Sequence, residues 1–357
     1  MFRKMSLCFF VLPLLVVLLP QPAAAQHYKQ TNLVSDVPGL AASTDPDLVN
    51  PWGLTRSATS PWWVSDNGTG KSTLYNGAGN KLALVVTVPP PSGSTPTGVV
   101  FNGGSGFVVM QGMASGPARF IFATEDGTIS GWNPAVDPTH AIIAVNNAGS
   151  AIYKGITLAT AASNTYLYAA NFKSGKVDIY TSTWARTSVP GQFADPLLPA
   201  GYAPFNVQNI GGNILVMFAK QGTMPDEVDG RGLGYVDEFD SLGNLLLRLQ
   251  HGPWLNAPWG VAQSPASFGQ FSNNILVGNF GSGEIAAFNP ATGEFLGRLH
   301  GAQGTLVIPG LWALQFGGGA PNNGATTDLF FTAGIDDEEH GLFGTLTPIV
   351  KSDDERD

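Results

Sequence analysis

The chain has 357 residues, with 26 acidic and 17 basic side chains and a formal net charge of −9. This excess of negative charge repels phosphate backbones and argues against nucleic acid as a partner. Glycine and proline are abundant, with 45 and 26 residues, and only 12% of the residues are charged. Many turn residues between short apolar runs are typical of an all-β protein.

Residues 1–25 have the three parts of a secretory signal peptide. Arg3 and Lys4 give a basic start, residues 7–19 an apolar core, and Ala23 to Ala25 a small-residue cleavage site. A retained membrane anchor is the alternative, although the apolar core is shorter than the roughly 20 residues that span a bilayer. We expect cleavage near Ala25, a secreted or periplasmic protein, and no stable membrane span afterwards.

The mature chain is expected to lack cysteine, because Cys8 is the only one and lies in the signal peptide. Disulfides and cysteine-ligated metals are therefore not expected. Loss of Arg3 and Lys4 would leave 15 basic residues against 26 acidic ones. After the signal peptide we expect one domain over residues 26–350 and an acidic, disordered tail over residues 351–357.

A similar tetrapeptide opens an apolar strand six times, with third positions between 45 and 57 residues apart. The six begin at Pro51, Pro96, Tyr153, Pro204, Pro258 and Leu311. A period near 50 residues with several short strands per unit is typical of a β-propeller, in which each repeat is one sheet. The sequence therefore predicts a six-bladed β-propeller of the NHL or TolB-like kind with four strands per blade.

The strands expected in chain order fill five blades and leave the sixth with three. They are 52–55, 62–65, 72–75 and 82–88; 98–101, 119–124, 128–132 and 141–145; 155–159, 166–170 and 176–180, with a poorly marked outer strand; 205–208, 214–219, 235–240 and 245–250; 260–263, 275–278, 284–289 and 295–300; and 311–316, 328–333 and 342–346. Residues 28–35 are strand-like and are expected to complete the sixth blade, which removes a free sheet edge and closes the ring.

In such a ring the first strand of each blade begins, and the second ends, at the same mouth of the channel. The second strands end at Asp66, Glu125, Asn171, Lys220, Asn279 and Gly334, and the second positions of the tetrapeptides are Trp52, Thr97, Lys154, Phe205, Trp259 and Trp312. We expect a small molecule, a glycan or a protein to bind at this mouth, with Trp52, Trp259, Trp312 and Lys154 as the ligand-binding candidates.

The oxygen-bearing side chains of this mouth have two interpretations. Asp and Asn bond to their own backbone at turns, which is a purely structural role. Alternatively Asp66, Glu125, Asn171 and Asn279 hold Ca²⁺ or Mg²⁺, since hard cations prefer oxygen ligands. Lys220 in the same ring counts against a cation directly beside it.

The three tryptophans also have two interpretations. Large aromatic side chains commonly fill the interfaces between blades, and Trp52, Trp259 and Trp312 would then belong to the core. If they are exposed at the mouth, they suit stacking against a sugar or another flat ligand.

Two residues near the mouth are candidates for moving protons. His340 is the one histidine expected in a loop at the mouth, and Lys220 is the second candidate. The insertion of residues 221–234, which contains Asp226 and Glu227, is expected to be either a lid over the channel or a solvated loop.

The segment 239–245, followed by 256–262, resembles the repeat of NHL propellers, in which an Asp-x-x-Gly turn leads to a Pro-x-Gly-hydrophobic start. Over the mature chain, residues 31–36 and 50–53 are similar to an uncharacterised family of secreted bacterial propellers with a TolB-like fold. Some members of that family carry a C-terminal PEP-CTERM sorting signal, whereas this sequence ends in an acidic tail. The resemblance implies the six-bladed fold and no particular activity.

Two functions follow as hypotheses. The first is an exported, non-catalytic binding or scaffold propeller that uses the mouth of the channel. The second is a hydrolase or lyase that depends on a divalent metal, similar to the gluconolactonase-type enzymes, where Glu, Asn and Asp hold an ion that polarises a carbonyl group. That resemblance implies Glu125, Asn171, Asn279 and Asp66 as ligands by position alone, with His340 or Lys220 moving protons.

Overall fold

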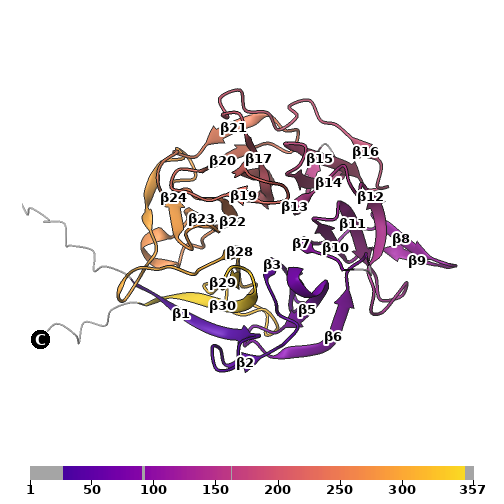
Figure 1. Cartoon of the computed structure of the whole chain (residues 1–357), viewed down its shortest axis with the longest axis horizontal. Helices are drawn as coiled ribbons and strands as arrows, with labels where there is room; N and C mark the ends of the chain where they lie inside the picture. Colours follow the sequence, from indigo (N-terminus) through magenta and orange to yellow (C-terminus); the bar gives the residue numbers. More distant parts are fainter. Residues whose placement is uncertain (1–26, 91–92, 162, 350–357) are drawn as a thin grey trace, which may run out of the picture.

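The structure, a computed structural model, describes residues 27–90, 93–161 and 163–349. The predicted signal peptide and acidic tail lie outside these residues. The described residues form six antiparallel sheets around a central axis, which confirms the all-β, six-bladed propeller (Figure 1). Within the same residues no helix combines the length and the apolar character needed to cross a membrane.

Blades one to three follow the predicted order, with the first strand of each at the axis. Blade one contains β3 (Pro51–Thr55), β4 (Trp62–Asp66), β5 (Lys71–Tyr75) and β6 (Lys81–Thr87); blade two contains β7 (Pro96–Phe101), β10 (Phe120–Thr124), β11 (Thr128–Trp132) and β12 (Ile142–Asn146); blade three contains β13 (Tyr153–Ala161), β14 (Asn164–Asn171), β15 (Lys176–Thr181) and β16 (Arg186–Thr187). The weakly marked outer strand of blade three is thus the two-residue β16.

Blades four to six have the same plan, and the sixth takes its outer strand from the start of the described chain. Blade four contains β17 (Tyr202–Ile210), β18 (Asn213–Gln221), β20 (Gly234–Phe239) and β21 (Leu245–Arg248), with β19 (Glu227–Val228) beside β18; blade five contains β22 (Pro258–Gln263), β23 (Ile275–Asn279), β24 (Ile285–Phe288) and β25 (Phe295–Arg298); blade six contains β28 (Leu311–Phe316), β29 (Leu329–Ile335), β30 (His340–Ile349) and β1 (His27–Ser35), with β2 (Ser43–Thr44) at its edge.

Closure of the ring depends on β1, as the sequence predicted. This strand pairs antiparallel with β30 from His27 opposite Ile349 to Ser35 opposite Leu342. The Tyr28 hydroxyl also donates a hydrogen bond of 2.9 Å to the Phe268 carbonyl, which ties β1 to blade five. The pairing covers the edge of β30, which would otherwise be a template for aggregation.

The repeated tetrapeptide produces the same irregularity in all six blades. The register between the first and second strands shifts within the tetrapeptide in each blade, as between Tyr153 and Gly155 of β13 or Pro258 and Gly260 of β22. A bulge of this kind redirects one side chain out of the regular pleat. The second residue of each tetrapeptide is buried at the axis, and the six are Trp52, Thr97, Lys154, Phe205, Trp259 and Trp312.

The third position of the tetrapeptide must be small where neighbouring first strands approach closely. A Cβ atom added at Gly53 would collide with the Thr97 carbonyl, and one at Gly98 would collide with the Ile156 backbone nitrogen. Glycine at these positions lets the blades converge on the axis.

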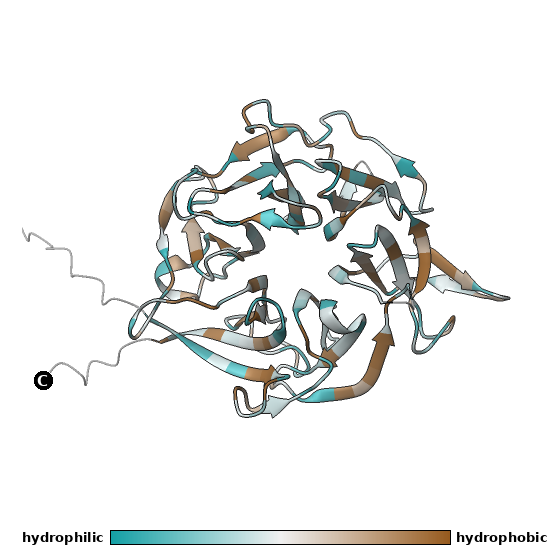
Figure 2. Cartoon of the chain, in the orientation of Figure 1, coloured by the Kyte–Doolittle hydropathy of each residue, from teal (hydrophilic) through white to brown (hydrophobic). Residues whose placement is uncertain are grey.

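One hairpin of blade two was not predicted. Strands β8 (Val108–Gln111) and β9 (Ala114–Pro117) form a two-stranded ribbon that projects from the rim of the ring (Figure 1). Apolar residues colour much of this ribbon brown in Figure 2, and Met113 at its tip is fully exposed. A second short ribbon, β26 (His300–Gly301) with β27 (Gly304–Thr305), follows blade five.

Candidate functional site

A cavity of about 630 Å³ lies at the mouth of the channel where the first strands begin. Strand ends and loops from all six blades line it. The lining residues are Trp52, Glu125, Lys154, Pro225, Asp226, Glu227, Asp229, Phe280, Gly281, Ser282, Gly283, Val307, Pro309, Gly310, Gly334, Asp336, Asp337 and Glu338. The volume is in the range of small-molecule sites.

Aromatic rings from the tetrapeptides close the channel beneath this cavity. Trp52 stacks on Trp312 with ring centroids 3.6 Å apart, and Trp259 meets both rings edge-on at 6.3 and 5.8 Å. Phe205 contacts the Trp52 and Trp312 rings at 6.4 and 5.9 Å. A second cavity of only about 20 Å³ is lined mainly by the residues that follow in the tetrapeptides. The aromatic plug therefore gives the mouth a closed floor.

Lys154 occupies the blade-three position in this plug. Its side chain is 2% exposed, and its Nζ lies 4.8 Å from the centroid of the Trp52 ring and 5.8 Å from those of Phe172 and Phe205. The ammonium pairs with Glu125, with Nζ 2.6 Å from Oε1. A buried cation needs such partners, and the aromatic faces add cation–π attraction.

Two asparagines extend this ion pair into a polar network. Asn67 Nδ2 donates to Glu125 Oε2 at 3.1 Å, and Asn50 Nδ2 donates to Glu338 Oε2 at 2.6 Å and lies 3.4 Å from Asn67 Oδ1. Asn50 Oδ1 in turn accepts a 3.0 Å hydrogen bond from Trp312 Nε1. The network fixes Glu125 and Glu338 in place between the plug and the cavity.

Glu227 comes from the insertion of blade four, which folds back over the mouth. Strand β19 pairs with the end of β18, placing Glu227 opposite Gln221. The Glu227 side chain is 8% exposed and its Oε2 is 3.9 Å from Lys154 Nζ. Within the described part of the chain, its carboxyl group receives no hydrogen bond from another residue. The insertion thus contributes a buried acid to the site, as well as covering it.

Burial changes the protonation of this cluster. It raises the pKa of Glu227 to about 7, since the nearby Lys154 offsets only part of the cost of desolvation. Burial also raises the pKa values of Glu338 and Asp229 above their ordinary range. For Lys154 burial alone would lower the pKa, but the Glu125 and Glu227 carboxylates outweigh it and raise that pKa.

Seven carboxyl groups and one lysine lie among the described residues that line the cavity, in two tiers. The three glutamates, Glu125, Glu227 and Glu338, lie deeper, near Lys154, while the four aspartates, Asp226, Asp229, Asp336 and Asp337, are more exposed. Because Lys154 is paired with Glu125, the charge that faces an entering ligand is negative. A concave, acidic mouth attracts cations.

The acidic turn between β29 and β30 has an uncommon backbone conformation. Asp336, Asp337 and Glu338 have φ of 52°, 52° and 67°, a region that residues other than glycine rarely adopt. Such strain persists only where the surroundings hold it, and it clusters at ligand sites. Here the hydrogen bond from Asn50 to Glu338 holds the turn against the floor of the cavity.

The three predicted tryptophans lie at the mouth but not as an exposed platform. Trp52 lines the cavity, whereas Trp259 and Trp312 are buried in the plug. Trp259 Nε1 donates to the Lys154 carbonyl at 3.0 Å. The geometry matches the interpretation in which these rings fill the core, since Trp52 is only 2% exposed where it borders the cavity.

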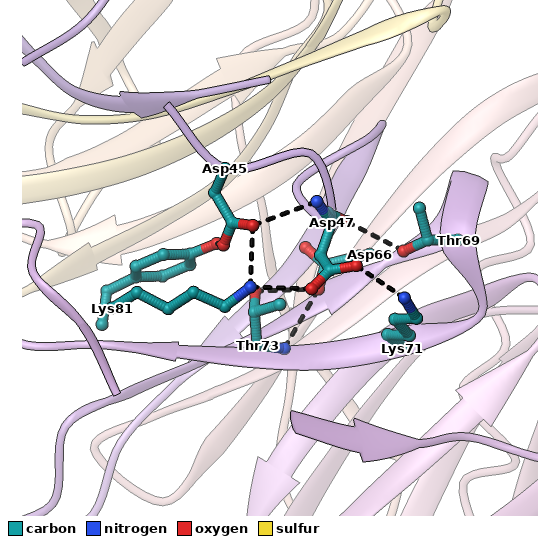
Figure 3. Close-up of polar contacts among 8 residues, drawn as sticks. Asp45, Asp47, Asp66, Thr69, Lys71, Thr73 and Lys81 are labelled. Carbon is teal, nitrogen blue, oxygen red and sulfur yellow. Dashed lines mark hydrogen bonds and ion pairs between the residues drawn. The ribbon is translucent and has the colours of Figure 1, made fainter. Parts of the chain in front are cut away.

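Asp66 belongs to a different polar cluster, inside blade one. Its Oδ2 accepts hydrogen bonds from the Thr73 backbone nitrogen at 3.0 Å and the Thr73 hydroxyl at 2.8 Å (Figure 3). Burial raises its pKa well above the ordinary value. Beside it, Lys81 bridges Asp45 and Asp47 at 2.7 Å each, which fastens the segment after β2 to blade one.

The side chains of the other two proposed metal ligands bond to the backbone of nearby loops. Asn171 Oδ1 accepts from the backbone nitrogens of Ile152 and Ser174, and Asn279 Oδ1 accepts from that of Asn256. Of the four candidates only Glu125 lines the cavity, and it is paired with Lys154. In the described residues no group of three or more His, Cys, Asp or Glu is placed to hold a metal ion. The proposed donor set therefore does not fit a Ca²⁺ or Mg²⁺ site.

The two candidates for proton transfer lie outside the residues that line the cavity. His340 Nδ1 is 2.7 Å from Asp36 Oδ2, a contact that raises the pKa of this histidine. Gly341 N donates to the other oxygen of Asp36 at 2.8 Å, so the pair supports the end of the acidic turn. Lys220 is exposed at the end of β18, opposite Tyr202 and Val228.

Sequence reasoning identified Glu125 and Lys154 but not the remaining acidic lining. The insertion with Asp226, Glu227 and Asp229 was expected to be either a lid or a solvated loop, and no role was predicted for Asp336, Asp337 and Glu338. The available signal was that both acidic segments follow second strands, which end at the mouth.

Comparison with known proteins identifies relatives among viral proteins. No protein-family model matches the chain. The chain is 33% identical over 335 residues to "Uncharacterized protein L690" of Acanthamoeba polyphaga mimivirus, covering 90% of this chain and 86% of that protein. It is 31% identical over 335 residues to "Uncharacterized protein R648" of the same virus, covering 90% and 81%. These relatives do not support the narrower assignment to a secreted bacterial family with PEP-CTERM signals.

Solved structures show the same fold at low sequence identity. Virginiamycin B lyase from Staphylococcus aureus matches with a TM-score of 0.52 and 10% identity, covering 91% of this chain and 100% of that chain. A protein of unknown function from Bacteroides thetaiotaomicron matches with a TM-score of 0.57 and 10% identity, covering 91% and 76%. At this identity the likeness extends to the propeller fold alone.

Proposed function

The chain belongs to the family of the mimivirus proteins L690 and R648, and on the geometry of its channel mouth we propose that it is a non-catalytic propeller that binds a ligand there. The observation that carries the proposal is a cavity of about 630 Å³ with a closed aromatic floor. A closed floor makes the mouth a pocket rather than a pore, and pockets of this volume accommodate small molecules or a projecting side chain of a partner.

A binding role is favoured over catalysis by the positions of the groups expected to move protons. His340 is paired with Asp36 and Lys220 is exposed on β18, and neither lines the cavity. The lysine that does belong to the cavity, Lys154, is buried in an ion pair with Glu125. Its ammonium is engaged in holding the floor of the pocket.

This proposal is tested by a ligand screen that compares the wild type with a variant whose cavity is filled by a large side chain. Ser282 lines the cavity in the hairpin of blade five, and Ser174 is its exposed counterpart in the blade-three hairpin. Neutral oligosaccharides, peptidoglycan fragments, amines and organic anions would be screened by tryptophan fluorescence, to which Trp52 at the cavity should respond. A ligand that binds the wild type and Ser174→Trp but not Ser282→Trp supports the proposal. A screen without any such ligand contradicts it.

A second candidate is an acid–base enzyme of the lyase or hydrolase class that uses no protein-held metal. The observation that favours it is the pKa of Glu227, which burial raises to about 7, near the value suited to proton transfer at neutral pH. The fold neighbour from Staphylococcus aureus is itself a lyase. Turnover of a mouth-bound ligand that is lost in Glu227→Gln supports this candidate, and unchanged ligand after prolonged incubation argues against it.

The proposal includes export of the protein. Residues 1–25 carry the basic start, apolar core and small-residue site of a signal peptide. Expression of the full chain in a secreting host, followed by mass spectrometry of the exported product, should give a mature start near Gln26. An exported product that retains Arg3 and Lys4 would instead indicate a membrane anchor.

A further inference from the structure

We infer that the ligand of the mouth is an organic cation, a compound with ammonium or guanidinium groups and an apolar body. This inference rests on the proposed function, since it names the ligand class for the same cavity. It draws on three features of the lining: a buried acid that receives no hydrogen bond from another residue, aromatic surface beside the acids, and the protein's own ammonium in the floor.

The first feature is the Glu227 carboxyl group. Its side chain is more than nine-tenths buried, it lines the cavity, and within the described residues no other residue donates a hydrogen bond to it. The nearest cation, Lys154 Nζ, is 3.9 Å from Oε2, beyond hydrogen-bond distance. A buried carboxyl group that accepts a hydrogen bond only from its own backbone nitrogen has unused acceptor capacity, and a cationic donor that enters the cavity would fill it.

The second feature is the apolar surface that lies among the acids. Trp52 and Phe280 line the cavity together with Pro225, Val307 and Pro309. Phe280 stacks on Trp312 with centroids 4.0 Å apart, so its orientation is fixed by the plug. Aromatic faces beside carboxylates favour an organic cation over a hydrated inorganic ion, because they attract the charge and also contact its carbon atoms.

The third feature is Lys154, which shows that this environment holds an ammonium. The group lies against three aromatic rings and is paired with Glu125 at 2.6 Å. It neutralises one of the three inner glutamates. Glu227 and the four outer aspartates still line the cavity. A ligand with two positive charges can therefore place one beside Glu227 and the other beside the aspartates.

Spermidine and its triacetylated derivative, which lacks the positive charges, separate charge recognition from shape. Isothermal titration of the wild type should give one spermidine per chain, and none of the triacetylated form. At pH 8, where Glu227 is ionised, Glu227→Gln removes one charge with little change of shape and should weaken binding about tenfold, as expected for one charge-assisted hydrogen bond. Glu294→Gln makes the same change on the exposed turn between β24 and β25, away from the cavity, and should leave the affinity unchanged.

Two controls exclude other causes of weaker binding: loss of folding in the variant, and general attraction of spermidine to the acidic surface. If Glu227→Gln lowers the melting temperature, Asp226→Asn serves instead, because Asp226 is exposed at the mouth and its loss should also weaken binding. Equal weakening by Glu227→Gln and Glu294→Gln would reveal general attraction to an acidic surface and overturn the inference. Absence of spermidine binding would overturn it as well.

Two further experiments distinguish an error in the ligand class from an error in the position of the binding site. Binding of Ca²⁺ or Mg²⁺, but not of spermidine, in a manner that requires Glu227 would assign the cavity to an inorganic ion and overturn the inference. A neutral or anionic ligand that is excluded by Ser282→Trp would preserve the proposed function while overturning the cationic class. If no compound binds at the mouth, both proposals fall together.

Discussion

Lys154 Nζ lies 2.6 Å from Glu125 Oε1 at the floor of the channel mouth, where blades two and three meet. The lysine occupies the second position of a repeated tetrapeptide that carries tryptophan in three other blades. A bulge in β13 between Tyr153 and Gly155 turns Lys154 towards the axis. One departure from the repeat thus places a cation inside an aromatic plug and beneath an acidic cavity.

Lys154→Met should destabilise the protein strongly at neutral pH. The substitution keeps the apolar stem but leaves Glu125 without its ion pair, and removal of one partner from a buried pair typically costs about 3–5 kcal/mol. Urea unfolding at pH 7 measures the loss. Lys176→Met, at an exposed position of β15, is the matched control and should cost less than about 0.5 kcal/mol. Equal effects of the two substitutions would refute a role for Lys154 in holding the floor.

Glu227 should make stability depend on pH in a defined direction. Its pKa rises from 4.5 to about 7 on folding, so the folded state binds the proton more tightly than the unfolded state does. The contribution of Glu227 to the free energy of unfolding is therefore complete below pH 4.5, and it is lost as the pH rises through about 7. Relative to Glu227→Gln, the wild type should lose on the order of 2 kcal/mol of unfolding free energy over this range.

The charged groups that face Glu227, namely Lys154, Asp229 and Glu338, are the same in both proteins, so the difference isolates this carboxyl group. Urea unfolding at half-unit steps of pH gives the two curves. Glu294→Gln, on an exposed turn, should run parallel to the wild type. A constant difference between wild type and Glu227→Gln across the range would show that the carboxyl group is not desolvated.

Asp66→Asn should be tolerated much better than Asp66→Ala. Burial raises the pKa of Asp66 well above its ordinary value, so the neutral acid is favoured, and asparagine keeps an oxygen to accept the two hydrogen bonds from Thr73. Alanine leaves both donors unsatisfied, at a cost of about 2 kcal/mol, whereas asparagine should cost less than about 1 kcal/mol. Unfolding at pH 7 distinguishes them, and equal losses would contradict a neutral, structural Asp66.

Ring closure by β1 should control the stability of the whole propeller. Val34 is buried where β1 pairs with β30, and Lys29 is exposed on the same strand. Val34→Asn should lose about 3 kcal/mol from lost apolar burial and an added polar group, while Lys29→Asn should change little. Thermal unfolding should remain a single transition at a lower temperature for Val34→Asn. A separate early transition, with the main one unmoved, would mean that β1 is only an appendage.

The fold was accessible from the sequence because one local pattern recurs in every blade. The tetrapeptides that begin at Pro51 and Pro258 each mark a first strand, β3 and β22, and the aromatic or small residues within them have the same packing role around the axis. The hairpin of β8 and β9 interrupts the repeat in blade two and has no counterpart between the first and second strands of the other blades, as far as the structure describes them. Nothing in the periodicity could therefore predict it.

The site was only partly accessible because its composition depends on how loops fold over the mouth. The second-strand ends suggested Glu125, which lines the cavity, but Asn171 and Asn279, at equivalent positions, bond to the backbone of their own hairpins. Glu227 reaches the cavity because β19 pairs with β18, a contact of two residues on each strand that a sequence pattern does not reveal. Repeat register specifies where backbones lie, whereas hydrogen bonds made in the folded state decide which side chains remain free.

The most direct test of the account is a crystal structure of the protein grown with spermidine at saturating concentration. The account predicts difference density for the polyamine in the mouth cavity, with an amine within hydrogen-bond distance of Glu227 and its methylene groups against Phe280. Density confined to another surface, or an empty mouth at a concentration where titration shows full binding, would contradict it.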